Sequence, residues 1–282
     1  MTRVRVLAIE AEKCSGNDQV RCDMKKRIAA LLLAIALLCL TGCGSVRDLV
    51  LDEAKTYEIT AQIRSLDIRI NAADLKIEYG EKCSVVSNLK NLEVTENNGT
   101  LTLKELTRAK VSFGDDLYEG AMLTVYLPAG TELERVGLLT GAGRFTVDTL
   151  SAQRIDLELG AGDVAIGSLF VTGSAVMEGG AGRITVSGGR INDFDLEMGV
   201  GELDLTAALT GDCELEMGVG DAKITLLGNR EDYQLEISKG IGAISVDGNE
   251  VPGLDSSGSG ANEIEISGGI GAIDVRFMDP KD

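Results

Sequence analysis

Acidic side chains recur at a fixed spacing in the second half of this chain of 282 residues. The spacing becomes visible when the sequence is aligned on its Gly-X-Gly repeats. One set of carboxylates occupies the same position in four consecutive repeats: Glu158, Glu178, Glu197 and Glu216. A second set lies two residues earlier and is interrupted by Val176: Asp156, Asp195, Glu214, Glu236 and Glu265. If the repeats are stacked strands, both sets form outward columns of like charge.

Such columns cost stability unless a counter-charge neutralises them. Stacked strands lie about 4.8 Å apart, and two like charges at that distance repel by about 0.9 kcal/mol even in bulk water. Carboxylates at this spacing could share Ca²⁺ or bind a cationic partner such as a basic peptide. The other interpretation is a solvated face that keeps the protein soluble. No metal-ligand set is firm, and the acidic GGxGxDxUx calcium repeat does not match because the period here is about twice as long.

The sequence offers little support for enzymatic chemistry. The chain contains no His, the usual general base and the commonest metal ligand. A pair of carboxylates could still act as a glycosidase or lyase on a β-helix face, but nothing singles out such a pair. We therefore expect no enzyme and no catalytic residue.

A second chemical signal is Cys43. Lys25, Lys26 and Arg27 precede an apolar run over 28–40, which is too short to span a bilayer and has the anatomy of an export signal. The ending Leu40-Thr41-Gly42-Cys43 resembles the lipobox of bacterial lipoproteins. That resemblance implies cleavage before Cys43, diacylglycerol on its thiol and no other cofactor. Residues 24–42 are then the signal peptide and 43–56 a tether. Residues 1–23 are predicted to be a mis-assigned or disordered extension upstream of a start at Met24.

The net charge of the chain limits the classes of partner that it can bind. The whole chain carries −18 at pH 7, which argues against nucleic acid or bare anionic lipid as the ligand. A lipid anchor at the extracytoplasmic face of the cell membrane would hold such a protein where electrostatics alone would repel it. Beyond Cys43 only Cys83 and Cys213 remain, and we expect Cys213 to be a buried free thiol.

The elements that must position these residues are strands between glycine corners. The Gly-X-Gly motif begins at seven places, separated by 19, 20, 19, 19, 22 and 29 residues: Gly141, Gly160, Gly180, Gly199, Gly218, Gly240 and Gly269. A near-constant period of this length indicates a solenoid. Consecutive rungs are expected to pair in parallel around an aliphatic interior.

Alternation within each rung predicts where the chain bends. Leu196, Met198 and Val200 share one phase, and Leu203 and Leu205 continue in the other. A phase change at each second glycine indicates a bend or bulge there, and places Val200 with the inward residues. The predicted fold is all-β: a parallel β-helix or β-roll of ~19–22-residue rungs over 136–282, continuous with an irregular N-terminal β cap and first turns over 57–135.

Two stretches carry a family resemblance: LTVYLPAGTELERVGLLTGAGRFTV, beginning at Leu123, and LELGAGDVAIG, beginning at Leu157. They resemble the DUF4097 family of β-strand-repeat proteins, whose members are loosely labelled adhesins. The resemblance covers about residues 60–276. It implies a β-solenoid at the bacterial cell surface or envelope, and supplies no catalytic residues.

These observations favour a lipid-anchored, non-catalytic surface module that binds or scaffolds and could be adhesive. One alternative is an envelope sensor or regulatory component that recognises a peptide or a cell-wall fragment. A carbohydrate-active β-helix enzyme is the third. The sequence does not name the protein, peptide or cell-wall partner.

Overall fold

The computed structural model describes residues 51–106, 120–252 and 254–279. Residues 1–50, which hold the predicted signal and Cys43, lie outside the described residues, and no helix in the described part is long and apolar enough to cross a membrane. The elements of the first half are β1 (Leu51–Glu58), β2 (Ser65–Gly80), β3 (Ser84–Leu89), β4 (Leu92–Asn97), β5 (Thr100–Glu105), β6 (Met122–Pro128) and β7 (Leu133–Val186). Those of the second half are β8 (Gly189–Asn192), β9 (Phe194–Thr210), β10 (Asp212–Leu227), the 3₁₀ turn η1 (Arg230–Asp232), β11 (Tyr233–Ile241), β12 (Ile244–Val246), β13 (Asn249–Glu250), β14 (Leu254–Gly258), β15 (Asn262–Ile270) and β16 (Ile273–Met278).

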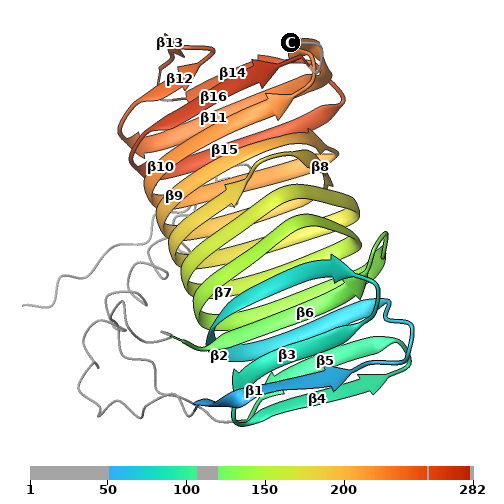
Figure 1. Cartoon of the computed structure of the whole chain (residues 1–282). Coiled ribbons are helices and arrows are strands. Elements are labelled where there is room, and N and C mark those ends of the chain that lie inside the picture. The colour runs from blue at the N-terminus through green and yellow to red at the C-terminus, as the bar shows by residue number, and fades with distance from the viewer. Residues whose placement is uncertain (1–50, 107–119, 253, 280–282) are drawn as a thin grey trace, which may run out of the picture. The chain divides into compact units, whose positions relative to one another are not determined.

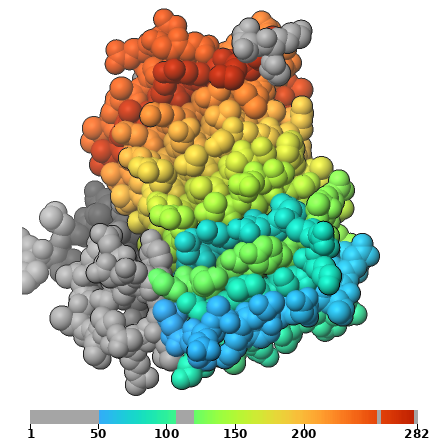
Figure 2. Space-filling view, viewed as in Figure 1, coloured from blue at the N-terminus to red at the C-terminus, as the bar shows by residue number. Residues whose placement is uncertain are grey.

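These strands wind into a β-solenoid, which confirms the predicted fold. β2 pairs in parallel with β7, β7 with β9, and β9 with β10, each in an unbroken register such as Leu215 opposite Leu196. Figure 1 shows β7 coiling continuously through several turns between the cap strands and β9. Figure 2 shows the result as successive bands of colour from the blue N-terminal strands to the orange and red C-terminal ones.

Each turn has three short sides. In one turn the fully buried side chains come in three successive pairs: Ile155 and Leu157, Val164 and Ile166, Leu169 and Val171. We call these sides A, B and C. Between the pairs the chain turns, so the alternation of inward and outward residues restarts on each side. The interior is a stack of aliphatic pairs because each strand contributes only every second residue to it.

The Gly-X-Gly motif forms the corner between sides A and B. Its second glycine has a positive φ, for example 132° at Gly162 and 137° at Gly182. A Cβ added at Gly182 would overlap the carbonyl oxygen of Gly162 on the rung beneath. Glycine is needed here both for the backbone conformation and for the close approach of stacked backbones.

The middle residue of the motif departs from the predicted phase. Val200 was expected to point inward with Leu196 and Met198, but its side chain is 43% exposed. The corner takes up the residues between Met198 and Leu203, which is the next buried side chain. Because the chain turns over those residues, alternation cannot be extended through them, and Val200 lies on the outside of the bend.

The last rungs do not stack in sequence order. β15 pairs with β10 on one side and with β11 on the other, and β16 likewise separates β10 from β12. The final rung of the chain is therefore inserted between the two rungs that precede it. This differs from the expected pairing of consecutive rungs, and it accounts for the irregular intervals of 22 and 29 residues between the last three motifs.

Both ends of the stack are closed by antiparallel strands. At the N-terminal end β5 pairs in parallel with side A of β2 and forms a hairpin with β4, while β3 and β1 add antiparallel strands beyond β6. The turn of this hairpin is Asn98-Gly99, with φ of 52° and 79°. At the other end β14 covers β11 and β13 covers β12. Such caps occupy the edges that a bare rung would expose.

Candidate functional site

The outward residues of side A form a continuous acidic surface. We call it the acidic face and define it by its twelve carboxylates: Asp156, Glu158, Glu178, Asp193, Asp195, Glu197, Asp212, Glu214, Glu216, Glu236, Glu263 and Glu265. Eleven of them lie in three columns, two residues apart along each strand, on rungs that include β7, β9, β10, β15 and β11; Asp193 is the residue immediately before β9 and begins the same row. The columns arise because alternate residues of a strand share a face.

The first column brings together the four glutamates that the sequence aligned. Glu178 lies opposite Glu197, and Glu197 opposite Glu216. Glu158 continues the column, since Gly180 stacks on Gly160 two residues further along both rungs. On the outer rungs the column ends in Ser267 and Ser238.

The second column also forms as aligned, with one change in its order. Asp195 lies opposite Glu214, Glu214 opposite Glu265, and Glu265 opposite Glu236. Val176 interrupts the column beside Asp195, as the sequence indicated. Because the final rung is inserted between the two that precede it, Glu265 lies between Glu214 and Glu236. The order of these residues in the sequence does not reveal this.

A third column was missed by the sequence reasoning. Asp212 lies opposite Glu263, and Asp193 starts the neighbouring rung two residues before Asp195. The signal was present, because each of these residues stands two positions before a member of the second column. Asp193 also supports the backbone of the next rung, because its carboxylate accepts a hydrogen bond from the Asp212 backbone N–H at 3.3 Å.

The acidic face is hollowed where the second and third columns meet. A depression of about 440 Å³ lies over side A from the rung of Ser174 to the rung of Gln234. Its lining includes seven carboxylate residues and the edges of buried residues such as Phe194 and Cys213. It is an open, anionic surface, and it lacks the enclosed apolar walls typical of small-molecule pockets.

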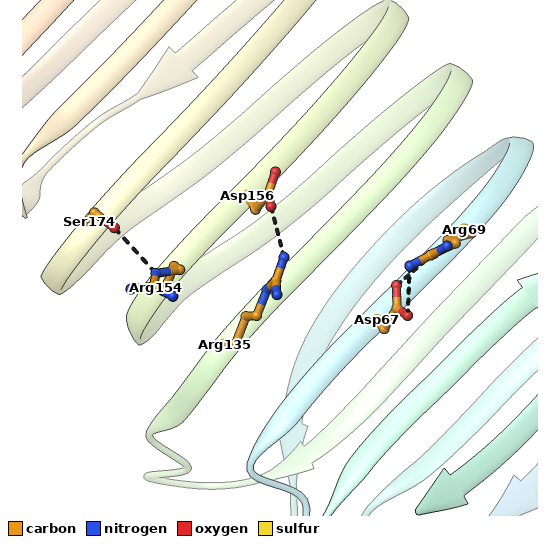
Figure 3. Close-up of polar contacts among 6 residues, drawn as sticks. All are labelled: Asp67, Arg69, Arg135, Arg154, Asp156 and Ser174. Carbon is orange, nitrogen blue, oxygen red and sulfur yellow. Dashed lines mark hydrogen bonds and ion pairs between the residues drawn. The ribbon is translucent and has the colours of Figure 1, made fainter.

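Basic residues bound the acidic face at its N-terminal end (Figure 3). Arg135 donates a hydrogen bond to Asp156 at 2.9 Å, and Arg154 donates to Ser174 at 3.4 Å. One rung further out, Arg69 is paired with Asp67 at 2.9 Å. Arg135 therefore supplies counter-charge at the first rung of the face.

The outward charges of side B are arranged differently from those of side A. Across successive rungs, one outward column reads Asp74, Arg144, Asp163, Arg183, Glu202, Asp221, and its signs alternate as far as Glu202. Arg183 contacts Glu202 at 2.6 Å, and Arg144 lies 3.9 Å from Asp163. Alternating signs in register stabilise stacked strands, whereas like signs destabilise them. The same repeat thus carries charges of mostly alternating sign on side B and charges of one sign on side A.

Burial and neighbouring like charges shift the pKa values of two glutamates of the acidic face. Burial, together with the charges of Glu158 and Glu197, raises the pKa of Glu178. Burial raises the pKa of Glu216 to about 7, assisted by the charge of Glu214 and a hydrogen bond to it. Both shifts favour the neutral acid, as expected of carboxylates surrounded by like charge.

The arrangement does not amount to a preformed metal site. Within the described residues, no three His, Cys, Asp or Glu side chains are grouped so that they could hold a metal ion. Calcium binding by the acidic face stays a prediction.

The two cysteines of the described chain are both free and buried. Burial raises the pKa of the Cys213 thiol to about 11. Cys43 and its preceding Leu40, Thr41 and Gly42 fall outside the described residues, and lipidation stays a prediction.

Comparison with known proteins gives one family and several solved structures. A model of the family described as Toastrack DUF4097 matches residues 57–276. Similar solved structures include a “putative cell adhesion protein” of Clostridium sporogenes (12% identity, 80% of this chain and 99% of that one, TM-score 0.35) and a “putative adhesin” of Parabacteroides merdae (14%, 82% and 100%, TM-score 0.39). Another is a “putative lipid binding protein” of Parabacteroides distasonis (17%, 79% and 96%, TM-score 0.28). No curated protein matches the chain.

Proposed function

This chain belongs to the Toastrack DUF4097 family, and we propose that it is a non-catalytic binding module of the bacterial cell envelope whose acidic face binds a cationic partner. The observation that supports this most strongly is the contrast between the two sides of one repeat. Side B pairs its charges across rungs, as Arg183 does with Glu202. Beyond the Arg135–Asp156 pair at its first rung, side A stacks carboxylate on carboxylate.

Solubility alone does not require such an arrangement. A chain with a net charge of −18 would stay soluble with its acids distributed singly. Stacking them in register costs folding stability on every rung, and the charges of Glu214 and Glu197 add to the burial that raises the pKa of Glu216. A surface that is strained by its own charge gains free energy when a cation arrives, which is the behaviour of a binding site.

The partner must then carry positive charge along a line that crosses the strands. The first two columns run over neighbouring rungs about 4.8 Å apart, so a basic peptide or a basic protein segment can meet several carboxylates in sequence. The depression of about 440 Å³ over side A offers concave room for such a segment. Ca²⁺ is the simpler ligand of the same face and is tested alongside it.

The experiment uses residues 46–282, a compact unit that contains all of the buried core from Ile63 to Val275. Oligolysine of ten residues is the cationic probe, and binding is measured by calorimetry and fluorescence anisotropy at 0.15 M salt. One variant replaces Glu158, Glu178, Glu197 and Glu216 with Gln. The control replaces four exposed acids outside the face, Glu81, Glu93, Glu132 and Glu250, and changes the net charge equally.

We expect the first variant to lose most of its affinity for oligolysine and the control to keep it. Equal losses in both variants would show that only net charge matters, and no binding by the wild type would remove the proposal. For Ca²⁺, binding heat and a raised melting temperature at millimolar concentration are expected if the cation is shared by the columns. Absence of both would restrict the face to larger cationic partners. Release of sugar from a glycan by the wild type would contradict the non-catalytic assignment.

Attachment to the membrane through Cys43 is a separate part of the proposal. It is supported by the lipobox sequence and by the acidic charge, which would otherwise keep the domain away from an anionic membrane. Metabolic labelling with a palmitate analogue in a bacterial host tests it. Label on the wild type and none on Cys43→Ser is expected, whereas equal label on both would refute the anchor.

A further inference from the structure

A row of aliphatic side chains, three of them exposed and one half-buried, runs along the corner between sides A and B. It consists of the middle residues of four stacked Gly-X-Gly corners, and we call it the aliphatic ridge: Val200, Val219, Ile270 and Ile241, in spatial order. Val200 lies opposite Val219, Val219 opposite Ile270, and Ile270 opposite Ile241. The exposed fractions are 43% for Val200, 52% for Ile270 and 70% for Ile241.

The ridge is graded along the stack. The corresponding residues of the earlier rungs are Ala142, Ala161 and Ala181. Size therefore rises from alanine through valine to isoleucine toward the C-terminal end. Exposed β-branched side chains in contiguous rows are uncommon on monomeric proteins and mark interaction surfaces.

The residues beside the ridge change in step with it. Next to Val200 and Val219 stand the carboxylates of Glu197 and Glu216, three residues earlier on each rung. Next to Ile270 and Ile241 the same positions are Ser267 and Ser238, and on the side B flank Ala272 and Ala243 are exposed. The nearby Lys239 ammonium donates a hydrogen bond to the carbonyl oxygen of Gly242 within its own corner. The surface is thus apolar at one end and rimmed with acid at the other.

The spacing of the ridge fits a helix better than a strand. Rungs repeat about every 4.8 Å, and one helical turn advances about 5.4 Å, so over the three steps of the ridge the mismatch grows to about 2 Å. An extended strand presents every second residue about 6.7 Å apart, and its mismatch exceeds a full rung over the same distance. A helix about 10–12 Å across laid on the ridge also brings its flank over the glutamate column.

We propose that the aliphatic ridge, together with the adjoining glutamates of the acidic face, docks a basic amphipathic helix of a partner protein. The apolar stripe of that helix lies on Val200, Val219, Ile270 and Ile241, and its Lys or Arg side chains reach Glu197 and Glu216. Helix-in-groove and helix-on-ridge recognition rest on the same i, i+3, i+4, i+7 spacing of apolar anchors. The inference rests on the proposed function, because it names the class of cationic partner for the same face.

Charge complementarity favours this occupant over two others. A second copy of the chain would bring a second acidic face against the first, with repulsion between the columns. An anionic bilayer would be repelled in the same way. A partner that satisfies both the ridge and the glutamates must combine apolar and positively charged side chains.

The test uses an 18-residue peptide of leucine and lysine, patterned so that the leucines form one stripe of a helix. A scrambled peptide of the same composition is the matched probe, and oligolysine is the third. The ridge variant is Val200→Thr, Ile241→Thr and Ile270→Thr, which keeps β-branched residues at exposed strand positions. The control variant is Leu106→Thr, Phe170→Thr and Met278→Thr, three exposed apolar residues outside the ridge.

The ridge variant should bind the patterned peptide at least about tenfold more weakly and oligolysine as well as the wild type does. The control variant should bind both normally, and the scrambled peptide should bind the wild type no better than oligolysine. The proposal is overturned if the ridge variant keeps full affinity for the patterned peptide, or if both peptides bind equally. The two proposals can fail separately. If the variant of Glu158, Glu178, Glu197 and Glu216 loses oligolysine binding but the ridge variant keeps full affinity for the patterned peptide, the proposed function is upheld and the helix-docking proposal is wrong.

Two further measurements examine the other occupants. If light scattering shows that the wild type self-associates and the ridge variant does not, the ridge is an interface between copies and the proposal is wrong. The same holds if the wild type, but not the ridge variant, co-sediments with vesicles of neutral or anionic phospholipid. A monomeric wild type that leaves vesicles in solution is the expected result.

Discussion

Glu197 and Glu216 lie directly opposite one another on adjacent rungs of the solenoid, with both side chains on the outward face of side A. Two like charges in register on neighbouring strands oppose folding. The consequence is concentrated at Glu216, because its carboxyl is also half-buried and has Glu214 as a hydrogen-bond partner. This pair connects the stability of the protein to pH.

The first prediction concerns Glu216→Gln. In the folded protein the pKa of Glu216 is raised from 4.5 to about 7, so the folded state binds a proton that the unfolded state releases. The stabilisation from that proton is present below about pH 4.5 and is lost as the pH rises through 7. Glutamine cannot ionise and keeps the neutral hydrogen bond. At pH 8 the variant should therefore be more stable than the wild type, by about 1 kcal/mol once solvent screening is allowed for.

Thermal unfolding at pH 5 and pH 8 checks this prediction. The melting temperatures of variant and wild type should differ by about 2–4 °C at pH 8 and converge at pH 5. Glu250→Gln, an exposed carboxylate in β13, is the control and should match the wild type at both pH values. A Glu216→Gln variant that gains nothing at pH 8 would contradict the electrostatic account of the acidic face.

The second prediction concerns the corner glycines. Gly201 has φ of 151°, and a Cβ there would overlap the carbonyl oxygen of Gly182 and crowd the Met198 side chain. Gly201→Ala should destabilise the fold by about 3 kcal/mol or more, since the rungs must separate or the corner must rebuild. Gly80→Ala, where no atom lies within 4 Å of the added Cβ, should have little effect. Urea unfolding of the two variants gives the comparison, and equal stabilities would refute the packing argument.

Much of this architecture was readable because the repeat is regular. A period of 19 or 20 residues fixes which residues of neighbouring rungs face each other, so the column from Glu158 to Glu216 could be aligned from sequence alone. The corner glycines were equally explicit, because few other positions demand glycine at so constant a spacing. Two columns of the acidic face followed from these two facts.

The rest depended on geometry that alternation does not encode. Val200 was placed inward because a period of two was continued through a corner, where the chain turns and the period has no meaning. Arg69 and Asp67 belong to a first rung in which Ala72-Ala73 replaces the glycine motif, opposite Ala142-Gly143. That rung carries no repeat signature, and the outermost basic residue beside the acidic face, Arg69, was missed with it.

The third prediction concerns Cys213. Its thiol is buried beside the acidic face, contacts the Thr210 carbonyl oxygen at 3.6 Å, and has its pKa raised to about 11. The reactive thiolate is therefore scarce at neutral pH and inaccessible as well. In residues 46–282 carrying Cys83→Ala, a thiol reagent at pH 8 should label Cys213 only as the protein unfolds.

Labelling rates in increasing urea check this prediction. The rate should follow the unfolding transition measured by circular dichroism. Thr149→Cys, an exposed position on side C placed in a chain with Cys83→Ala and Cys213→Ala, should react at once. Rapid labelling of Cys213 in the absence of urea would show that side A opens locally.

The fourth prediction follows from the order of the last rungs. Gly218 and Gly269 are 51 residues apart in sequence, yet they stack on neighbouring rungs. Deleting residues 229–260 would shorten that interval to 19 residues, the period of the regular rungs, and would join the end of β10 to β15 in the existing register. β11 to β14 therefore behave as an insertion that folds back over the last regular rung. The deletion should leave a folded solenoid with a newly exposed edge at β15.

Truncation after residue 260 should have the opposite result, although it removes fewer residues. It takes away β15 and β16, which are the only described strands that join β10 to β11 and β12. The outer rung then loses its parallel partner, and β10 loses its cover. Amide hydrogen exchange should show β10 protected in the internal deletion and unprotected in the truncation, with β11 also unprotected. If the truncated chain kept β11 protected, β11 would have docked onto β10 in place of β15, and the inserted rung would be dispensable for the fold.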